Sequence, residues 1–433
     1  MDNRTPVLRH KSIPADTQTE MDGTPGEQIM NMIGIPGQGF PLLEKMPSYL
    51  AADVDEMKNR ALVLRGGKPG SLMDFGIGNP DQDVPHWILE TMFTEAKKSG
   101  ASGYMPSQGI PELRKSIVNW YQRNHSVDLN SEQDTIVTIG SKEGIAHLAL
   151  ALVQPGDIII VPDPAYPIHA QAFEIAGATV QRIPLEPSEN FLFEIEEHIR
   201  NSSKPIRGLV LNFPCNPTGL CMEDGFFERM VQLAIKHRFW IIHDFAYADI
   251  TFDGFRAPSI LKTPGAKDVA VEFFTMSKSY NMAGWRVGFM CGNAKVVKAL
   301  KHAKPYFDYG MFRPIQHAAA VALECGGKYV KEVRNTYQRR RDLLLSGLLN
   351  IGWHVPPPRG GMFIWAQIPP PFKHLGSMGF SQLLLNEIGV VVFPGIGFGP
   401  SGNDFVRFSL TQEEAVINRA IDSMRKIFDV HIR

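Results

Sequence analysis

The sequence predicts an α/β protein with a mostly parallel sheet covered by helices, followed by a smaller α+β domain. Its 433 residues exceed what one hydrophobic core usually serves. Apolar strands alternate with helical segments from about residue 85, which is typical of βαβ units, and this pattern changes after about residue 314. We therefore expect a flexible extension (1–38), a large domain (83–314) and a small domain built from 39–82 and 315–433.

Short β-branched and apolar runs predict the strands, and amphipathic runs predict the helices. The expected strands of the large domain are 135–139, 158–161, 209–213, 240–243, 269–275 and 287–290. Helices are expected at 144–153 and 225–236 between them. The small domain should contain one long helix (315–349), a strand (361–367) and a final helix from about residue 412.

The charge balance gives no indication of a nucleic-acid partner. Lys and Arg (44) nearly equal Asp and Glu (45), whereas nucleic-acid binding needs a basic excess. The one basic cluster, Arg339-Arg340-Arg341, lies in a helical pattern and is interpreted as a solvated helix face.

Cysteine spacing and hydropathy indicate a cytoplasmic protein without a structural metal. Cys215, Cys221, Cys291 and Cys325 form no CxxC pair, so free thiols in a reducing compartment are expected. No apolar run reaches the length of about 18 residues that a membrane span needs, and the N-terminus lacks the basic segment and apolar core typical of a secretory signal.

Polar residues follow four of the predicted strands, at the edge where α/β sheets bind ligands. Ser141 opens a helix after 135–139, where it suits a phosphate or merely caps the helix. Asn216 follows 209–213 in a turn-forming segment, which is either a structural loop or a ligand donor. Asp244 follows 240–243. A buried carboxylate there either has a positive or protonated partner or caps the next segment.

The fourth position is Lys278, which follows 269–275 among small hydroxyl residues and lies eight residues before Arg286. A lysine whose pKa is lowered can form a Schiff base, although most lysines are simply exposed.

Together these features resemble the class I and II aminotransferases, which are fold-type I enzymes dependent on pyridoxal phosphate (PLP). The motifs are Asn216-Pro217-Thr218-Gly219, Asp244-x-x-Tyr247, Ser277-Lys278-x7-Arg286 and Phe405-Val406-Arg407-Phe408. The resemblance runs from about residue 40 to the C-terminus. Within the family, 243–249 and 272–286 are most similar to glutamate–pyruvate (alanine) aminotransferases and next to LL-diaminopimelate aminotransferases.

The resemblance implies a PLP-dependent aminotransferase for which alanine and 2-oxoglutarate are the expected donor and acceptor. Lys278 would carry the cofactor and then move the substrate Cα proton. Asp244 would keep the pyridine nitrogen protonated, while Tyr247 and Asn216 would bind the ring oxygen. Tyr166 would stack on the ring.

The same resemblance assigns the phosphate and the substrate. The phosphate ligands would be Ser141, Lys142, Thr275, Ser277, Arg286 and Tyr104 of the partner subunit, which implies a homodimer with shared active sites. Thr275 and Lys142 differ from the commonest family residues, which puts only the side-chain role of Lys142 in doubt. The substrate would be bound by Arg407 through its carboxylate, with Asn216 beside it, and Gly78 would let the backbone pass close.

Several alternatives stay open at this point. Arg313 could bind the distal carboxylate of glutamate, or it could simply be exposed. An LL-diaminopimelate or other amino-acid aminotransferase and a PLP β-lyase would use the same residues. The effector domain of a DNA-binding regulator is disfavoured because residues 1–40 are too short for a helix-turn-helix domain.

Overall fold

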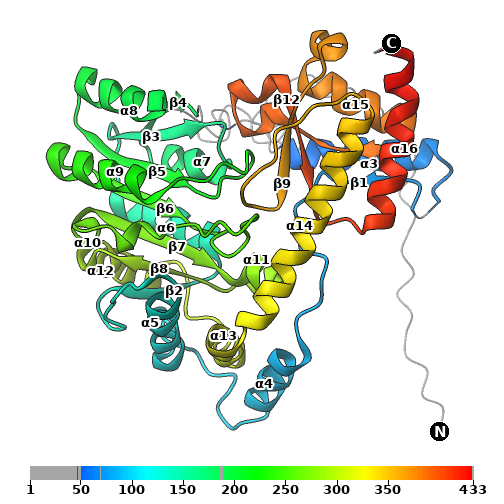
Figure 1. Ribbon diagram of the computed structural model, residues 1–433. Helices are drawn as coiled ribbons and strands as arrows, with labels where there is room; N and C mark the ends of the chain where they lie inside the picture. Colours follow the sequence, from blue (N-terminus) through cyan, green and yellow to red (C-terminus); the bar gives the residue numbers. More distant parts are fainter. Residues whose placement is uncertain (1–45, 47–49, 69, 186–188, 432–433) are drawn as a thin grey trace, which may run out of the picture. The chain divides into compact units, whose positions relative to one another are not determined.

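The predicted sheet is present and mostly parallel. The computed structural model describes residues 46, 50–68, 70–185 and 189–431, and seven strands of this described chain form the sheet. Their order is β2-β8-β7-β6-β5-β3-β4, and β8 runs antiparallel to both of its neighbours (Figure 1). The strands are β2 (Thr135–Thr138), β3 (Ile158–Asp163), β4 (Thr179–Pro184), β5 (Ile206–Asn212), β6 (Trp240–Asp244), β7 (Ala270–Thr275) and β8 (Gly288–Gly292).

Strand β4 is missing from the predicted set, and its position explains why. It pairs on one side with β3, at the end of the sheet order. Most of its side chains are exposed or partly exposed, and its sequence Thr-Val-Gln-Arg-Ile-Pro mixes polar and apolar residues. The continuous apolar run that marks a buried parallel strand is therefore absent here.

Helices cover both faces of the sheet because alternate strand residues point to opposite sides. Ile136 packs into one hydrophobic cluster, with α6, α7 and α12, whereas its neighbour Val137 packs into the other, with α5, α8, α9 and α13. The bounds are α5 (Pro111–His125), α6 (Ser141–Leu152), α7 (Ile168–Ile175), α8 (Glu189–Asn201), α9 (Asp224–His237), α12 (Ala294–Ala303) and α13 (Arg313–Cys325).

A second region has its own core. Strands β11 (Phe393–Pro394), β12 (Phe405–Ser409) and β9 (Phe363–Gln367) form an antiparallel sheet, and β1 (Met73–Asp74) pairs in parallel with β10 (Val390–Val391). The helices around them are α3 (Leu50–Leu64), α14 (Gly327–Asn350), α15 (Gly376–Ile388) and α16 (Glu414–His431) (Figure 1). Most of these elements contribute to one hydrophobic cluster, the Trp353 cluster, which includes Trp353, Phe363 and Phe408.

The long helix expected over 315–349 is in fact two helices, α13 and α14, which meet at Gly326. A Cβ at Gly326 would lie 2.5 Å from the Ala322 carbonyl oxygen and 2.6 Å from the Tyr280 ring. Two successive glycines also disfavour a continuous helix. The amphipathic pattern continues across the break, so hydrophobic periodicity alone did not reveal it.

Two arginines of the basic cluster at 339–341 do not lie on a solvated face, whereas Arg339 is exposed as expected. Arg340 forms a two-pronged ion pair with Asp81 at 2.9 and 2.7 Å, and Arg341 pairs with Asp253 at 2.6 and 2.8 Å. Both arginines are buried. Their carboxylate partners lie far away in the sequence, so a local charge count missed the pairing.

Beneath the strand ends, the buried Glu272 of β7 joins several elements. Its carboxylate accepts hydrogen bonds from Tyr121 Oη (2.9 Å), Ser259 Oγ (2.7 Å) and Ile260 N (3.0 Å), and His243 Nδ1 lies 2.8 Å away. Burial opposes ionisation, but the hydrogen bonds from His243 and Ser259 and the His243 charge lower the pKa of Glu272. The network fixes β6 and β7 just below the residues that end them.

The four cysteines are free, as expected; Cys325 is exposed and the other three are buried. No helix in the described part of the chain has both the length and the apolar character to cross a membrane. The expected flexible extension (1–38) lies outside the described residues.

Candidate active site

The carboxyl ends of three adjacent strands carry most of the predicted site residues. Strands β5, β6 and β7 lie side by side in the sheet and are parallel. Asn216 follows β5, Asp244 is the last residue of β6, and Lys278 follows β7 in the short helix α11 (Met276–Ser279). Parallel neighbours end at the same edge, so these three residues are carried at one edge of the sheet.

Lys278 points its ammonium group at the backbone of residue 78. Its Nζ donates a hydrogen bond to the Gly78 carbonyl oxygen at 2.8 Å. Burial and the charges of Arg407 and Arg286 lower the pKa of Lys278 to about 8. About a tenth of this amine is therefore neutral, and nucleophilic, at pH 7, far more than for a lysine with the ordinary pKa.

Asp244 has a partner that sequence reasoning missed. His169 Nε2 lies 2.9 Å from Asp244 Oδ2, where its N–H donates to the carboxylate, and both residues are buried. The other oxygen, Oδ1, accepts from Ala246 N at 3.2 Å, and the Asp244 carbonyl accepts from Asn212 Nδ2 at 2.7 Å. The available signal was the position of His169, three residues after Tyr166 on the first turn of α7.

Two tyrosines lie beside this carboxylate. The Tyr166 ring meets the His169 ring edge-on, with 5.8 Å between centroids. Tyr247 is buried, and its ring packs edge-on against Phe363 at 5.9 Å. Burial raises the pKa of Tyr247 far above its ordinary value, opposed by the Arg407 charge, so this phenol stays protonated and can donate.

A small cradle forms where the N-terminus of α6 meets Arg286. A Cβ at Gly140 would lie 2.4 Å from Arg286 Nη2, and one at Gly288 would lie 2.8 Å from Ser141 N. Arg286 is exposed; its Nη1 donates to Ala283 O at 2.7 Å and its Nη2 to Ile139 O at 3.4 Å. The guanidinium therefore lies against the helix N-terminus, a combination that favours an anion.

The hydroxyl residues before Lys278 are held together locally. Thr275 Oγ1 lies 2.9 Å from Ser277 Oγ and donates to Val287 O at 3.1 Å, and it also accepts from Ser277 N at 3.3 Å. Lys142 is exposed and its ammonium lies 6.0 Å from the centre of the Tyr166 ring.

Arg407 is a buried cation surrounded by rings. Its Nη1 donates to Asn216 Oδ1 at 2.8 Å and its Nη2 to Gly76 O at 2.9 Å. Its guanidinium lies 4.0 to 5.1 Å from three aromatic rings, those of Phe363, Phe398 and Phe393. Little water surrounds this charge, which strengthens its attraction for a carboxylate.

Packing against Phe363 requires glycine at position 78, in addition to the expected close approach of the backbone to the substrate. A Cβ at this position would lie 2.5 Å from the Phe363 ring. Any side chain would therefore displace the ring that packs on Arg407 and Tyr247, and would also shift the carbonyl that Lys278 binds.

The contacts that the structure gives for two other predicted residues, Tyr104 and Arg313, are not with Lys278, Asp244 or Asn216. The Tyr104 side chain is 85% exposed and its ring packs on Tyr309 at 4.7 Å. Arg313 is exposed at the start of α13; together with the Lys98 hydrogen bond and the His317 charge it lowers the pKa of Glu95 in α4 (His86–Ala96).

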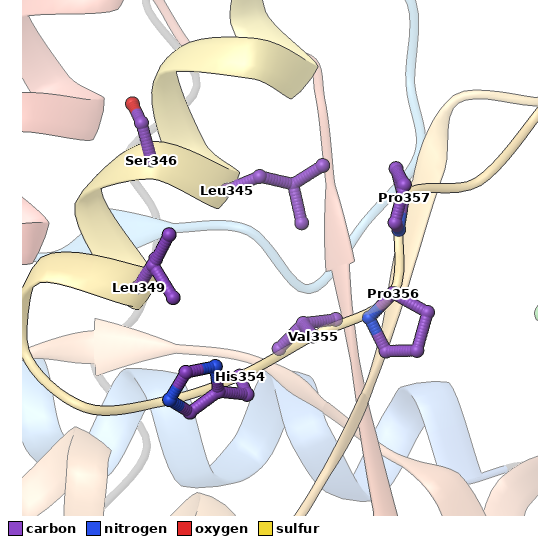
Figure 2. Close-up of a pocket in the computed structure, with 7 residues that line it drawn as sticks. All are labelled: Leu345, Ser346, Leu349, His354, Val355, Pro356 and Pro357. Carbon is purple, nitrogen blue, oxygen red and sulfur yellow. The ribbon is translucent and has the colours of Figure 1, made fainter.

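An apolar pocket away from these residues carries none of the predicted chemistry. Figure 2 shows it between the end of α14 and the following loop. Its lining residues are Leu345, Ser346, Leu349, His354, Val355, Pro356 and Pro357. None of them is among the predicted site residues, so we do not regard this pocket as the active site.

The proteins to which this chain is similar are aminotransferases. The family described as aminotransferase class I and II matches residues 71–424. The glutamate–pyruvate aminotransferase AlaC of Escherichia coli is 46% identical over 91% of this chain and 94% of its own length. LL-diaminopimelate aminotransferase 2 of a Nostoc species is 37% identical over 88% and 97%. The structure of a Thermus thermophilus aspartate aminotransferase mutant superposes with a TM-score of 0.81, at 28% identity over 91% and 100%.

Proposed function

Because this chain belongs to the class I and II aminotransferases and is an enzyme of the transaminase type, we propose that it transfers the amino group of L-alanine to 2-oxoglutarate. The observation that carries the choice of substrates is the 46% identity to a glutamate–pyruvate aminotransferase over nearly the whole of both chains. The family implies PLP as the cofactor.

The residues present fit PLP. An aldehyde needs a neutral amine, and the pKa of Lys278 is lowered to about 8. A pyridine nitrogen needs an anionic partner, and Asp244 is a buried carboxylate at the end of β6. A phosphate needs backbone N–H groups and a cation. The start of α6 and Arg286 provide them, and the absence of a Cβ at Gly140 and Gly288 allows these groups to lie close together.

The proposed proton transfer depends on Lys278. Its Nζ would hold the cofactor and, as a free amine, would take up the proton that leaves the substrate Cα and give it back. PLP, when bound, supplies the electron sink that makes this proton acidic. Asp244, oriented by His169 at 2.9 Å, would keep a proton on the pyridine nitrogen.

Asn216 and Arg407 would act as one unit on the substrate. Asn216 Oδ1 accepts from Arg407, so its Nδ2–H group is the end that can donate to the ring oxygen, together with the Tyr247 hydroxyl. Arg407 would then exchange its contacts with Asn216 and Gly76 for the two oxygens of the substrate carboxylate. Gly78 keeps the backbone open beside it.

The phosphate would be bound by groups from two subunits. We assign Ser141 and the Lys142 backbone at the start of α6, the hydroxyls of Thr275 and Ser277, and Arg286. Tyr104 would come from the partner subunit. Its high exposure supports this assignment, as do four further exposed aromatic residues on the segment that follows α12: Tyr306, Phe307, Tyr309 and Phe312.

We also propose the domain division expected from the sequence and a cytoplasmic location. The pairing of β1 with β10 supports grouping residues up to 82 with those after 314, and the Trp353 cluster gives that part a core. The free thiols support a reducing compartment.

A second candidate is an LL-diaminopimelate aminotransferase, supported by 37% identity to the Nostoc enzyme. Its substrate carries a second ammonium and a second carboxylate group. Arg313, which is a candidate for the distal carboxylate of glutamate in the first function, could equally serve that second carboxylate. The polar residues assigned above do not distinguish between the two donors, because all of them act on the part that the two amino acids share.

The deciding experiment is an absorption spectrum of the purified protein with L-alanine and no oxo acid. We expect a visible cofactor band that bleaches while one equivalent of pyruvate forms per site. A band that alanine leaves unchanged but LL-diaminopimelate bleaches would replace the proposed donor. Continuous pyruvate and ammonia release from cystathionine would indicate a β-lyase instead. Protein reconstituted with PLP that shows no band would refute the cofactor assignment.

A further inference from the structure

A buried lysine outside the proposed catalytic set lies among three side chains that could otherwise hold a metal. Glu143, His147 and Asp308 bring their ligand atoms within 4.8 Å of one another. Lys304 is only 1% exposed, and its Nζ lies 3.0 Å from Glu143 Oε1 and 2.5 Å from Asp308 Oδ1. The ammonium group is thus the cation of this cluster, which forms an ion-pair network without needing a metal.

On one side, the network reaches the phosphate cradle. Glu143 is the third residue of α6, and its Oε2 accepts a hydrogen bond from Ile139 N at 2.6 Å. The carbonyl of the same Ile139 accepts from Arg286 Nη2 at 3.4 Å. Glu143 therefore holds the turn that positions both the start of α6 and Arg286.

A charged Glu143 carboxylate creates an electrostatic problem beside a phosphate. Burial by itself disfavours the charge, but hydrogen bonds from His147, Lys304 and Asp308 and the Lys304 charge lower the pKa of Glu143, while burial and Glu143 raise the pKa of Asp308. A second anion next to a phosphate would repel it unless a cation lies close to the carboxylate. Lys304 is that cation, at 3.0 Å.

On the other side, the network reaches Tyr104. Asp308 is followed by Tyr309, whose ring packs on Tyr104 at 4.7 Å, and by Gly310, whose N–H donates to Met105 O at 3.0 Å. A Cβ at Gly310 would lie 2.2 Å from Pro106 O, so the two segments are in close contact. The position of Tyr104 therefore depends on the segment that Lys304 holds through Asp308.

We propose that Lys304 is a positioning residue of the phosphate site. Through Glu143 it holds and neutralises the cradle of its own subunit, and through Asp308 it sets the Tyr104 arm. This inference rests on the proposed function, because the phosphate is that of PLP. It assigns Lys304 no contact with the cofactor or substrate.

The test measures binding by the apoprotein and not turnover. Lys304→Met is compared with wild type by spectral titration with PLP and with pyridoxal, which lacks the phosphate. We expect PLP binding to weaken about tenfold, with pyridoxal binding unchanged, because only the phosphate site is disturbed. Lys301→Met is the matched control: Lys301 lies three residues earlier, in α12 (Ala294–Ala303), but donates to Glu132 O, and both affinities should stay at wild-type values.

A second variant keeps the proposal testable if Lys304→Met does not fold. Asp308→Asn preserves the shape of the side chain and leaves Lys304 on Glu143, so it should weaken PLP binding less than Lys304→Met and again spare pyridoxal. Equal loss of PLP and pyridoxal binding, or no loss of either in both variants, would overturn the proposal. Failure of the wild-type apoprotein to bind PLP would instead overturn the proposed function itself.

Discussion

At the residue scale, the Lys278 pKa links catalysis to stability. A neutral amine is required at neutral pH, and the surroundings that provide it, burial and the Arg407 and Arg286 charges, oppose protonation in the folded state. The same groups that make the lysine reactive thus destabilise its charged form, so the apoprotein should show a distinct dependence of stability on pH.

We expect apoprotein stability to rise with pH between about 8 and 10.5. The folded pKa of Lys278 is lowered to about 8 from 10.5, so in this window the unfolded chain binds a proton that the folded chain has lost. Relative to Lys278→Met, wild type should gain about 1 to 3 kcal/mol across the window. Chemical denaturation of both apoproteins at several pH values measures this difference, and parallel curves would contradict it.

The contact between His169 and Asp244 leads to a second prediction. His169→Ala leaves Asp244 Oδ2 buried without its 2.9 Å partner, and the loss of such a partner typically costs about 1–3 kcal/mol. We expect kcat/KM to fall about tenfold or more.

His169→Asn serves as the control for this prediction. The asparagine amide can still donate to the carboxylate, so this variant should recover part of the loss. Steady-state kinetics with the apoprotein melting temperature alongside would separate misorientation of Asp244 from general unfolding. Equal kcat/KM for the alanine variant and wild type would refute the role.

At the element scale, the junction of α13 and α14 packs directly on the segment that follows Lys278. Gly326→Ala would place a Cβ 2.5 Å from Ala322 O and 2.6 Å from the Tyr280 ring, two residues beyond Lys278. We expect a loss of about 1–3 kcal/mol in the free energy of unfolding, as is usual for overpacking.

The next residue provides a control for this substitution. A Cβ at Gly327 would meet nothing within 4 Å, so Gly327→Ala should leave stability unchanged or slightly raise it. Urea denaturation compares the two variants with wild type. Equal stabilities would show that Tyr280 and α14 move apart at little cost.

The sequence anticipated the strands with continuous apolar runs, together with the polar residues that follow them. Asn216, Asp244 and Lys278 could be expected at one sheet edge because each follows a strong strand signal, and parallel neighbours end together. Strand β4, with its mixed composition, had no comparable signal, and the break at Gly326 was marked by the Gly326-Gly327 pair alone, inside an unbroken amphipathic pattern.

The residues that support this edge could not be found in the same way. Lys304 and Glu143 are 161 positions apart, and His169 and Asp244 are 75 apart. Neither pair produces a local pattern, because the contacts arise only when distant helices pack on the sheet. A buried lysine and an exposed one also look alike in a single sequence.

At the scale of the whole molecule, the site is proposed to be completed by a second copy of the chain. Tyr104 is 85% exposed and its ring packs on Tyr309, which is 60% exposed, although the resemblance assigns the Tyr104 hydroxyl to a phosphate. This geometry predicts that Tyr104 serves the partner's site. Hybrid dimers of two different variants can test that prediction, because it is then known which subunit supplies Lys278 and which supplies Tyr104.

We expect a hybrid of Lys278→Ala and Tyr104→Phe subunits to contain one site with wild-type affinity for PLP. The only Lys278 in this dimer belongs to the Tyr104→Phe subunit, and its site would receive Tyr104 from the Lys278→Ala subunit. Differently tagged subunits allow the hybrid to be purified, and spectral titration then compares its PLP affinity with both parents. The Tyr104→Phe homodimer should bind PLP more weakly because each of its sites lacks the hydroxyl donor. If the hybrid has the weakened affinity of that homodimer, Tyr104 acts within its own subunit and the shared site is wrong.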